Sequence, residues 1–193
     1  MRTRFILLTP VLLLAACTSA LPKGDAVTQE MLKNPLFAQN YYSDLTEHFV
    51  SLQIHNDPSM DDPAMKSIAD DARVEALARA QKASAIVNEG INGSFIGITE
   101  DARGMALLAD GNLYFGPDFT VTPAGELHVF TTLSVDPRDV PFPGPDDTDV
   151  GPVKLAYGAQ TYVLPPVKEA PGQLSVVLYD KMLKRLHAFA QLI

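Results

Sequence analysis

The chain has 193 residues, of which 15 are Lys or Arg and 23 are Asp or Glu, and its formal net charge at pH 7 is −8. This acidic balance argues against nucleic acid as a partner, because phosphate groups are bound mainly by Lys and Arg. The chain holds one cysteine, Cys17, which excludes a disulfide within the chain and any site that needs two thiolates.

The first 17 residues have the features of an export signal. Two arginines among the first four residues precede an apolar run over residues 5–14. The run is too short to span a bilayer, which takes about 20 apolar residues, but it has the length of a signal-peptide hydrophobic region. It ends at Leu14-Ala15-Ala16-Cys17, which resembles the lipobox of bacterial lipoproteins. We therefore expect a signal peptide over residues 1–16 and lipid modification of the Cys17 thiol; the alternative is a buried helix with a core cysteine.

Lipidation would leave the mature chain, residues 17–193, without a free thiol. The signal peptide holds two of the basic residues and none of the acidic ones, so the mature chain has a net charge of −10. This charge opposes binding to anionic lipid head groups. We therefore expect the lipid on Cys17 to hold the protein at the bilayer through a tether over residues 17–24. Thr18 follows the cysteine, and the absence of Asp there resembles the outer-membrane sorting class, so in a Gram-negative host the protein would face the periplasm.

Residues 25–90 are predicted to form a helical hairpin. From Pro35 to about His55, apolar residues recur at spacings of three and four and form one stripe, which consists of Phe37, Tyr41, Leu45, Phe49 and Leu52. A second helix is expected from Pro63 to about Asn88, with one face that carries Met65, Ile68, Ala72, Ala76, Ala80 and Val87. The short link between the two helices predicts that they pack antiparallel.

The ends of both helices carry capping signals. Asn34 and Asp62 each precede a proline, which is the pattern of an N-cap followed by proline at the first helical position. Gly90 is placed as the C-terminal stop of the second helix.

Residues 91–193 change to short β-rich runs separated by Gly, Pro, Asn and Asp. Strands are predicted at 94–98, 104–109, 112–121, 126–133, 152–156, 160–164, 173–179 and 184–191. Many short strands with regular turns favour a sandwich or a barrel. No long helical crossover follows residue 94, which indicates antiparallel pairing.

This β-rich half resembles the DM-thirteen domain, also called the electron-transfer domain, which occurs in many exported bacterial proteins. The matching pieces follow the order of that family and lie at 93–97, 113–119, 126–131, 157–162, 175–179 and 187–190. The resemblance implies a compact β-sandwich over residues 91–193. The predicted fold class is thus α+β, with an N-terminal helical hairpin followed by an antiparallel β-sandwich.

The resemblance also marks a departure at residue 180. The family's redox role depends on a cysteine at the place where this chain has Asp180, and a carboxylate cannot perform thiol chemistry. Two interpretations of Asp180 remain open: a turn residue whose carboxylate accepts backbone N–H groups, or a ligand or cation site shared with His128 or Asp118. No cofactor is expected, and a metal is not excluded.

Other polar groups have less specific patterns. The aspartates between residues 136 and 149 suit either a solvated loop or a calcium site without EF-hand spacing. Helical His48 and His55 suit surface polarity more than a metal site, and His128 and His187 are expected to be half-exposed strand residues. Tyrosines within residues 157–162 suit sheet packing or a ligand-stacking surface.

No nucleophile and base occur in a known catalytic frame, so an enzyme is the less favoured class. The predicted function is a non-enzymatic binding or interaction module of the bacterial envelope, with the lipid bilayer and an unknown envelope protein or small ligand as partners. The alternative is a component of a periplasmic redox system.

Overall fold

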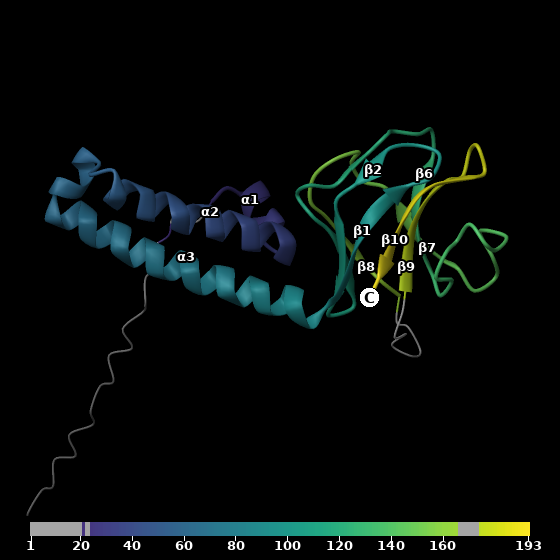
Figure 1. Cartoon of the computed structure of the whole chain (residues 1–193), viewed down its shortest axis with the longest axis horizontal. Helices are drawn as coiled ribbons and strands as arrows, with labels where there is room; N and C mark the ends of the chain where they lie inside the picture. Colours follow the sequence, from purple (N-terminus) through teal and green to yellow (C-terminus); the bar gives the residue numbers. More distant parts are fainter. Residues whose placement is uncertain (1–20, 22–23, 166–173) are drawn as a thin grey trace, which may run out of the picture.

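The computed structural model describes residue 21, residues 24–165 and residues 174–193, so the predicted signal peptide over residues 1–16 and Cys17 lie outside the described residues. A helical region comes first and consists of α1 (Ala26–Met31), α2 (Pro35–Ile54), a short 3-10 helix η1 (Pro58–Asp61) and α3 (Pro63–Glu89). The strands follow: β1 (Ile91–Gly97), β2 (Ala102–Arg103), β3 (Met105–Ala109), β4 (Asn112–Phe115), β5 (Thr120–Val121), β6 (Leu127–Thr132), β7 (Thr148–Pro152), β8 (Gln160–Val163), β9 (Leu174–Asp180) and β10 (Arg185–Leu192). Figure 1 shows the helices extending from one side of a compact β unit.

Both predicted N-caps are present. The Asn34 side chain accepts hydrogen bonds from the N–H groups of Leu36 and Phe37, and the Asp62 side chain accepts one from Ala64. Each cap satisfies N–H groups of the first turn that have no partner within the helix. The two long helices therefore begin where the sequence predicts.

The two long helices run antiparallel along each other. Gln39 of α2 donates to Ser84 of α3 at 3.5 Å, and Gln53, further along α2, donates to Asp70, which precedes Ser84 in α3. Contacts that advance along one helix and retreat along the other require opposite directions, as Figure 1 also shows. In the described part of the chain, no helix is both long enough and apolar enough to cross a membrane.

A seam of alanines holds these helices together. The buried residues of α3 are Ala69, Ala72, Ala76, Ala80 and Ala83. Small side chains allow two helix backbones to approach closely. The larger apolar residues of α3 lie outside this seam. We expected Ile68 and Ala72 of the predicted face to be buried. Ala72 is buried, but this expectation is wrong for Ile68, which is 56% exposed, and Met65 of the same predicted face is 52% exposed.

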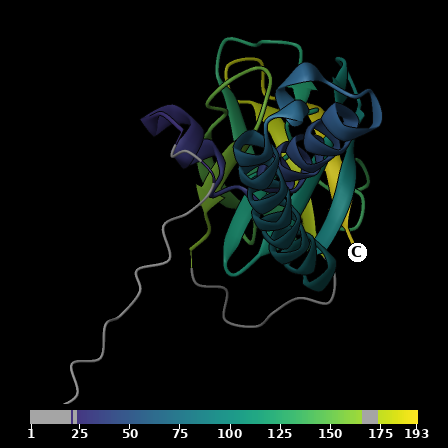
Figure 2. The same ribbon diagram turned by 90° about the vertical axis from the view of Figure 1, so that its left-hand side faces the viewer.

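The eight long strands form one antiparallel sheet that curls into a nearly closed barrel. The strand order is β7-β6-β9-β10-β1-β3-β4-β8, and β2 and β5 form a separate two-stranded sheet. Alternate side chains of the strands point into the barrel and make its core, as Phe115, Val129, Val176 and Leu178 do. Viewed along the helices in Figure 2, the strands curve round behind them.

The sequence correctly predicted helices followed by antiparallel β structure, but the predicted sandwich is not confirmed, because the strands form a nearly closed barrel. One sheet continues through eight strands rather than splitting into two facing sheets. The reason lies in the pairing of β1, which joins β10 on one side and β3 on the other and so links what would be two layers. The alternation of apolar and polar residues within one strand does not specify which distant strand pairs with it.

Side chains bridge the gap between the two edge strands of the barrel. Gln160 and Tyr162 of β8 accept hydrogen bonds from the N–H of Lys154, which follows β7, at 3.1 Å each. Gln160 also donates to the carbonyl oxygen of Leu155 at 2.8 Å. Burial raises the pKa of Tyr162 to about 12. The barrel is therefore closed at this seam by side chains instead of a continuous backbone ladder.

The helical region and the barrel share a buried joint. The Asn34 side chain, only 2% exposed, donates to the carbonyl oxygens of Phe115 and Gln160 at 2.9 and 3.0 Å. Beside it lies a small apolar cluster of Leu36, Leu107, Ala109 and Tyr114. One side chain thus caps α2 and also attaches it to the ends of two strands.

Gly90 ends α3 as predicted, but for a different reason from the expected one. Its φ of −80° is accessible to any residue. A Cβ at this position would lie 2.6 Å from a side-chain carbon of Leu107 and 2.7 Å from the backbone oxygen of Leu108. The glycine therefore permits close contact between the end of α3 and β3.

Candidate functional site

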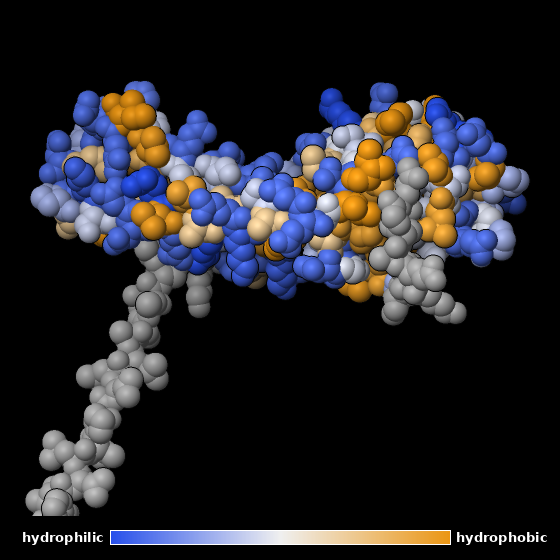
Figure 3. Space-filling model, turned by 60° about the horizontal axis from the view of Figure 1, so that its bottom comes forward, coloured by the Kyte–Doolittle hydropathy of each residue, from blue (hydrophilic) through white to orange (hydrophobic). Residues whose placement is uncertain are grey.

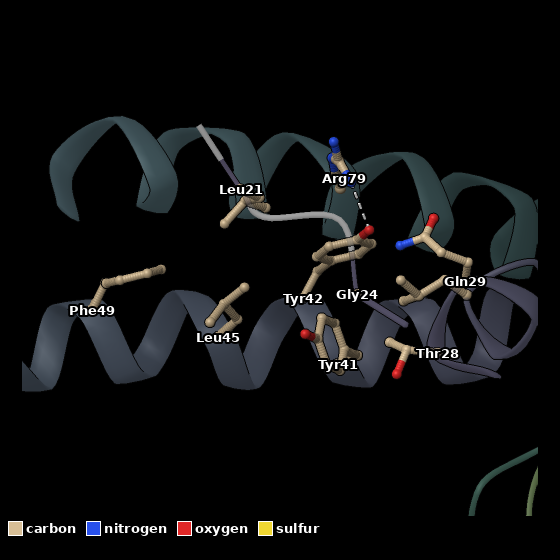
Figure 4. A pocket seen from close by; sticks show the side chains of 10 residues that line it. Leu21, Gly24, Thr28, Gln29, Tyr41, Tyr42, Leu45, Phe49 and Arg79 are labelled. Atoms are coloured by element: carbon tan, nitrogen blue, oxygen red, sulfur yellow. Dashed lines mark hydrogen bonds between the residues drawn. The ribbon is translucent and has the colours of Figure 1, made fainter. Parts of the chain in front are cut away.

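A groove lies along the helical region, between α2, α3 and the segment that leads into α1. Its volume is about 250 Å³, and Figure 4 shows the side chains that line it. One wall is apolar and comes from α2, with Tyr41, Tyr42, Leu45 and Phe49. Thr28 and Gln29 of α1 supply polar groups at one end. Pockets with apolar walls and a few polar groups are the usual form of small-molecule sites.

Arg79 of α3 provides the positive charge of the groove. Its guanidinium donates to the Tyr42 hydroxyl at 2.8 Å and lies 5.4 Å from the centre of the Tyr42 ring. It also forms an ion pair with Glu75. The hydrogen bond with Tyr42 is the largest of the effects that raise the pKa of Arg79. The arginine is thus held in position across the groove.

Leu21 occupies one part of the groove and packs against the helices. It is only 6% exposed and belongs to the apolar cluster that includes Ala72 and Ala76. Its N–H donates to a carboxylate oxygen of Glu75 at 3.0 Å. The chain is therefore attached to the helical region before α1 begins.

The sequence analysis did not identify this groove. The adjacent aromatic pair Tyr41-Tyr42, at the edge of an amphipathic stripe, is the only local signal for it. Arg79 gives no such signal, because a charged residue beside an alanine-rich face is typical of any solvated helix. Only the packing of α2 on α3 brings these residues together.

His128, one of the three proposed site residues, forms a pair with Asp149. Its ring nitrogen Nδ1 lies 2.8 Å from the nearer Asp149 carboxylate oxygen, and Lys181 donates to the other oxygen at 3.1 Å. Burial alone would raise the pKa of Asp149, but hydrogen bonds from His128 and Lys181 outweigh it and lower this pKa. The pair fixes the orientation of the imidazole on the outer side of β6.

Asp180 lies at the end of β9, on the face whose alternate residues Val176 and Leu178 point into the barrel. It is fully buried, and its Oδ1 accepts hydrogen bonds from the N–H groups of Met182 and Leu183 at 3.0 and 3.1 Å. Its Oδ2 has no hydrogen-bond partner among the described residues. These contacts agree with the turn interpretation of Asp180.

The three residues proposed for a shared site are not grouped together. Asp118 lies between β4 and β5, where it accepts from the N–H of Met105 at 3.4 Å. In the described part of the chain, no set of three or more His, Cys, Asp and Glu side chains could hold a metal ion. Cys17, the predicted lipidation site, lies outside the described residues.

His187 is fully buried, in contrast to the half-exposed strand histidine that was expected. It lies where the pairing of β10 with β9 shifts by one residue. Its Nε2 lies 2.9 Å from the carbonyl oxygen of Thr122, so Nε2 carries the proton of this hydrogen bond. The apolar residues around it, Leu186 and Ala188-Phe189-Ala190, are the sequence signal for this burial.

The acidic loop that follows β6 covers an apolar cluster on the outside of the barrel. Phe142 of this loop packs edge-on against Phe130 and Tyr179 at 5.5 and 5.4 Å between ring centres. Arg138 lies 5.3 Å from the ring centre of Phe189 and forms an ion pair with Asp136. The loop thus has a packing role, with its aspartates paired or facing solvent.

The tyrosines of residues 157–162 do not form one surface. Tyr162 is buried in the barrel seam, whereas Tyr157 is 70% exposed. The packing interpretation therefore holds for Tyr162, and the structure does not place the two rings together as a stacking platform.

None of the known protein families, curated proteins or solved structures compared with this chain matches it.

Proposed function

We propose that this protein is a lipid-anchored bacterial envelope protein whose helical region is a non-enzymatic binding module. The observation that carries the proposal is the groove beside Tyr41 and Arg79, which combines an apolar wall with a guanidinium held in place by Tyr42 and Glu75. An amphipathic small molecule or a short apolar peptide segment with a polar end fits this arrangement. The anchor is the lipid expected on Cys17, and it would keep the groove close to lipid and to envelope proteins.

The barrel is proposed to be a DM-thirteen-like domain that supports the helical region. In support, the six sequence pieces that resemble this family lie on or next to β1, β4, β6, β8, β9 and β10. The hydrogen bonds of Asn34 would then hold the start of α2 against these strands, and α2 forms the apolar wall of the groove.

A fluorescent apolar probe, N-phenyl-1-naphthylamine, tests the binding proposal on the chain from Thr18 to Ile193, which includes every described residue. Its fluorescence should rise and saturate with the wild-type sequence. Tyr41→Glu places a carboxylate on the apolar wall at a side chain that is already 39% exposed, and it should weaken probe binding about fivefold, or about 1 kcal/mol. Tyr157→Glu, at an exposed tyrosine of the barrel, is the matched control and should bind the probe as the wild type does. Absence of saturable binding, or equal loss in both variants, would contradict the proposal.

A redox or cation-binding role is the second candidate, and one observation favours it. Asp180 stands where the family that residues 91–193 resemble in sequence has a cysteine, and its buried Oδ2 has no hydrogen-bond partner among the described residues. A cation beside this oxygen would supply the missing interaction. Metal analysis and a visible spectrum of the purified protein test this role, and stoichiometric iron, copper or haem would favour it over the binding module.

A further inference from the structure

The attachment of Leu21 determines where the chain leaves the helical region on its way to Cys17. Leu21 is nearly buried, and its N–H is bonded to Glu75, near the middle of α3. Glu75 is 14 residues from the end of α3 at Glu89, or about 21 Å along the helix axis. The point of attachment is therefore on the helices and away from the barrel.

Only a short length of chain separates Cys17 from this point. Cys17 is four residues before Leu21, and four residues of fully extended chain span at most about 14 Å. A lipid on Cys17 can therefore enter a bilayer only if the bilayer surface comes near the part of the helical region that holds Leu21.

The face of the helices around Leu21 is suited to such contact. Tyr41 lines the groove on this side with 39% of its surface exposed. Ile68 lies seven residues before Glu75, so it is on the same face of α3, and it is 56% exposed. Figure 3 shows apolar patches on the helical region among hydrophilic surface. Glu75 is paired with Arg79, so these two charges compensate each other.

We propose that this groove face, defined by Leu21, Tyr41, Ile68 and Glu75, lies against the surface of the lipid bilayer. The proposal depends on the lipid anchor of the proposed function and adds the orientation of the anchored protein. The groove then opens next to lipid, and its occupant is drawn from the membrane surface, while the opposite face of α3 is turned to the aqueous phase. Tyrosine suits this position, because its ring is apolar and its hydroxyl reaches the polar layer.

Two single-cysteine variants of the lipidated full-length protein test this orientation. Ile68→Cys is on the groove face, and Leu77→Cys is on the other side of α3, two residues after Glu75, where the wild-type side chain is 42% exposed. Cys17 is the only natural cysteine and is occupied by lipid in this form, so each variant has one reactive thiol. Each is labelled with bimane and bound to phosphatidylcholine vesicles that carry a nitroxide quencher on some head groups.

Quenching should be several-fold stronger at position 68 than at position 77. Two further variants add Leu21→Glu to each of these, which places a carboxylate beside Glu75 and detaches the tether from the helices. Vesicle binding should then persist, and the difference between the two positions should disappear. Circular dichroism verifies that the helical content is unchanged.

The outcomes separate the orientation from the anchor. If the variants float with the vesicles but are quenched equally, or more strongly at position 77, the orientation is wrong and the anchor remains. If the protein carries no lipid by mass spectrometry and does not float, both the anchor and the orientation are wrong.

Discussion

At the scale of single residues, two aspartates accept hydrogen bonds from groups within their own turns. Asp180 accepts two backbone N–H groups of the turn that follows it, and Asp136 accepts the N–H and the side chain of Arg138. In both cases the acceptor is two or three residues from the donor. A short aspartate side chain in a turn makes such bonds readily.

Asp180→Asn should leave the free energy of unfolding within about 0.5 kcal/mol of the wild type. Asparagine keeps an oxygen that can accept from Met182 and Leu183. Asp180→Ala removes that acceptor from two N–H groups and should cost about 1–2 kcal/mol. Urea unfolding, with and without a chelator, measures all three proteins. A chelator-dependent loss of stability in the wild type, absent from Asp180→Asn, would show that a cation and not the turn determines the role of Asp180.

The ion pair of the acidic loop predicts a pH dependence. Hydrogen bonds from Arg138 lower the pKa of Asp136 to about 2. A lowered folded-state pKa stabilises the protein above the unfolded-state value of about 3.9, and this contribution is lost as the pH falls toward 2. The difference in Tm between the wild type and Asp136→Asn should therefore be constant above about pH 5, shrink as the pH falls toward 2 and vanish only below that value. A difference that stays constant down to pH 2 would show that Asp136 acts only through neutral hydrogen bonds.

At the scale of elements, the packing of α3 is decided by side-chain volume. Its seam against α2 is made of alanines, and the larger Val74 and Leu77 lie outside it. Phe49 and Leu45 of α2 reach the same seam but are only partly buried. The buried side chains that α3 contributes to this interface are thus small, and the larger apolar side chains come from α2 and from Leu21.

Ala76→Leu should destabilise the protein by about 1–3 kcal/mol, because Ala76 is fully buried in the seam and added carbons force the helices apart. Ile68→Ala, two turns earlier on α3, should cost less than about 0.5 kcal/mol, since this side chain is more than half exposed. Thermal unfolding followed by circular dichroism compares the two. A larger loss of stability for Ile68→Ala than for Ala76→Leu would show that Ile68 packs against α2, as the sequence predicted.

At the scale of the whole molecule, the helical region and the barrel are joined at two places. α3 continues into β1 through Gly90, which lies against β3, and the Asn34 side chain attaches the start of α2 to the ends of β4 and β8. Both long helices are therefore held at their barrel-side ends, and the opposite end of the helical region extends away from the strands (Figure 1). We expect the two parts to unfold in one transition.

Asn34→Asp tests the joint. Aspartate is as good an N-cap as asparagine, so a local capping role would leave the stability unchanged. In the structure, however, the Asn34 amide donates to two carbonyl oxygens in a buried position. A carboxylate there would lose both bonds and repel both oxygens, at a cost of about 3 kcal/mol or more. Urea unfolding monitored by circular dichroism for the helices and by the nuclear magnetic resonance signals of the β9 and β10 amides for the barrel should show lower stability or two separate transitions. An unfolding curve equal to that of the wild type would contradict the joint.

Local features of the fold were predictable and long-range ones were not. The starts of α2 and α3 follow from Asn34-Pro35 and Asp62-Pro63, because capping depends on neighbouring residues. The two-residue strand β2 has too few residues to show an alternating pattern and was not predicted. The groove was missed because its lining residues come from three elements, and only their packing brings Tyr42 and Arg79 together.

The sequence by itself determined the succession of helices and antiparallel strands, the caps of the helices and the turn role expected of Asp180, since each depends on residues a few positions apart. The tertiary structure decided that the strands close into a barrel, that the alanines of α3 rather than Ile68 face α2, and that His128 pairs with Asp149 rather than Asp180. These outcomes depend on which distant segments pair and which side-chain volumes fit between them. Local periodicity specifies a buried face, but it does not specify the surface that covers it.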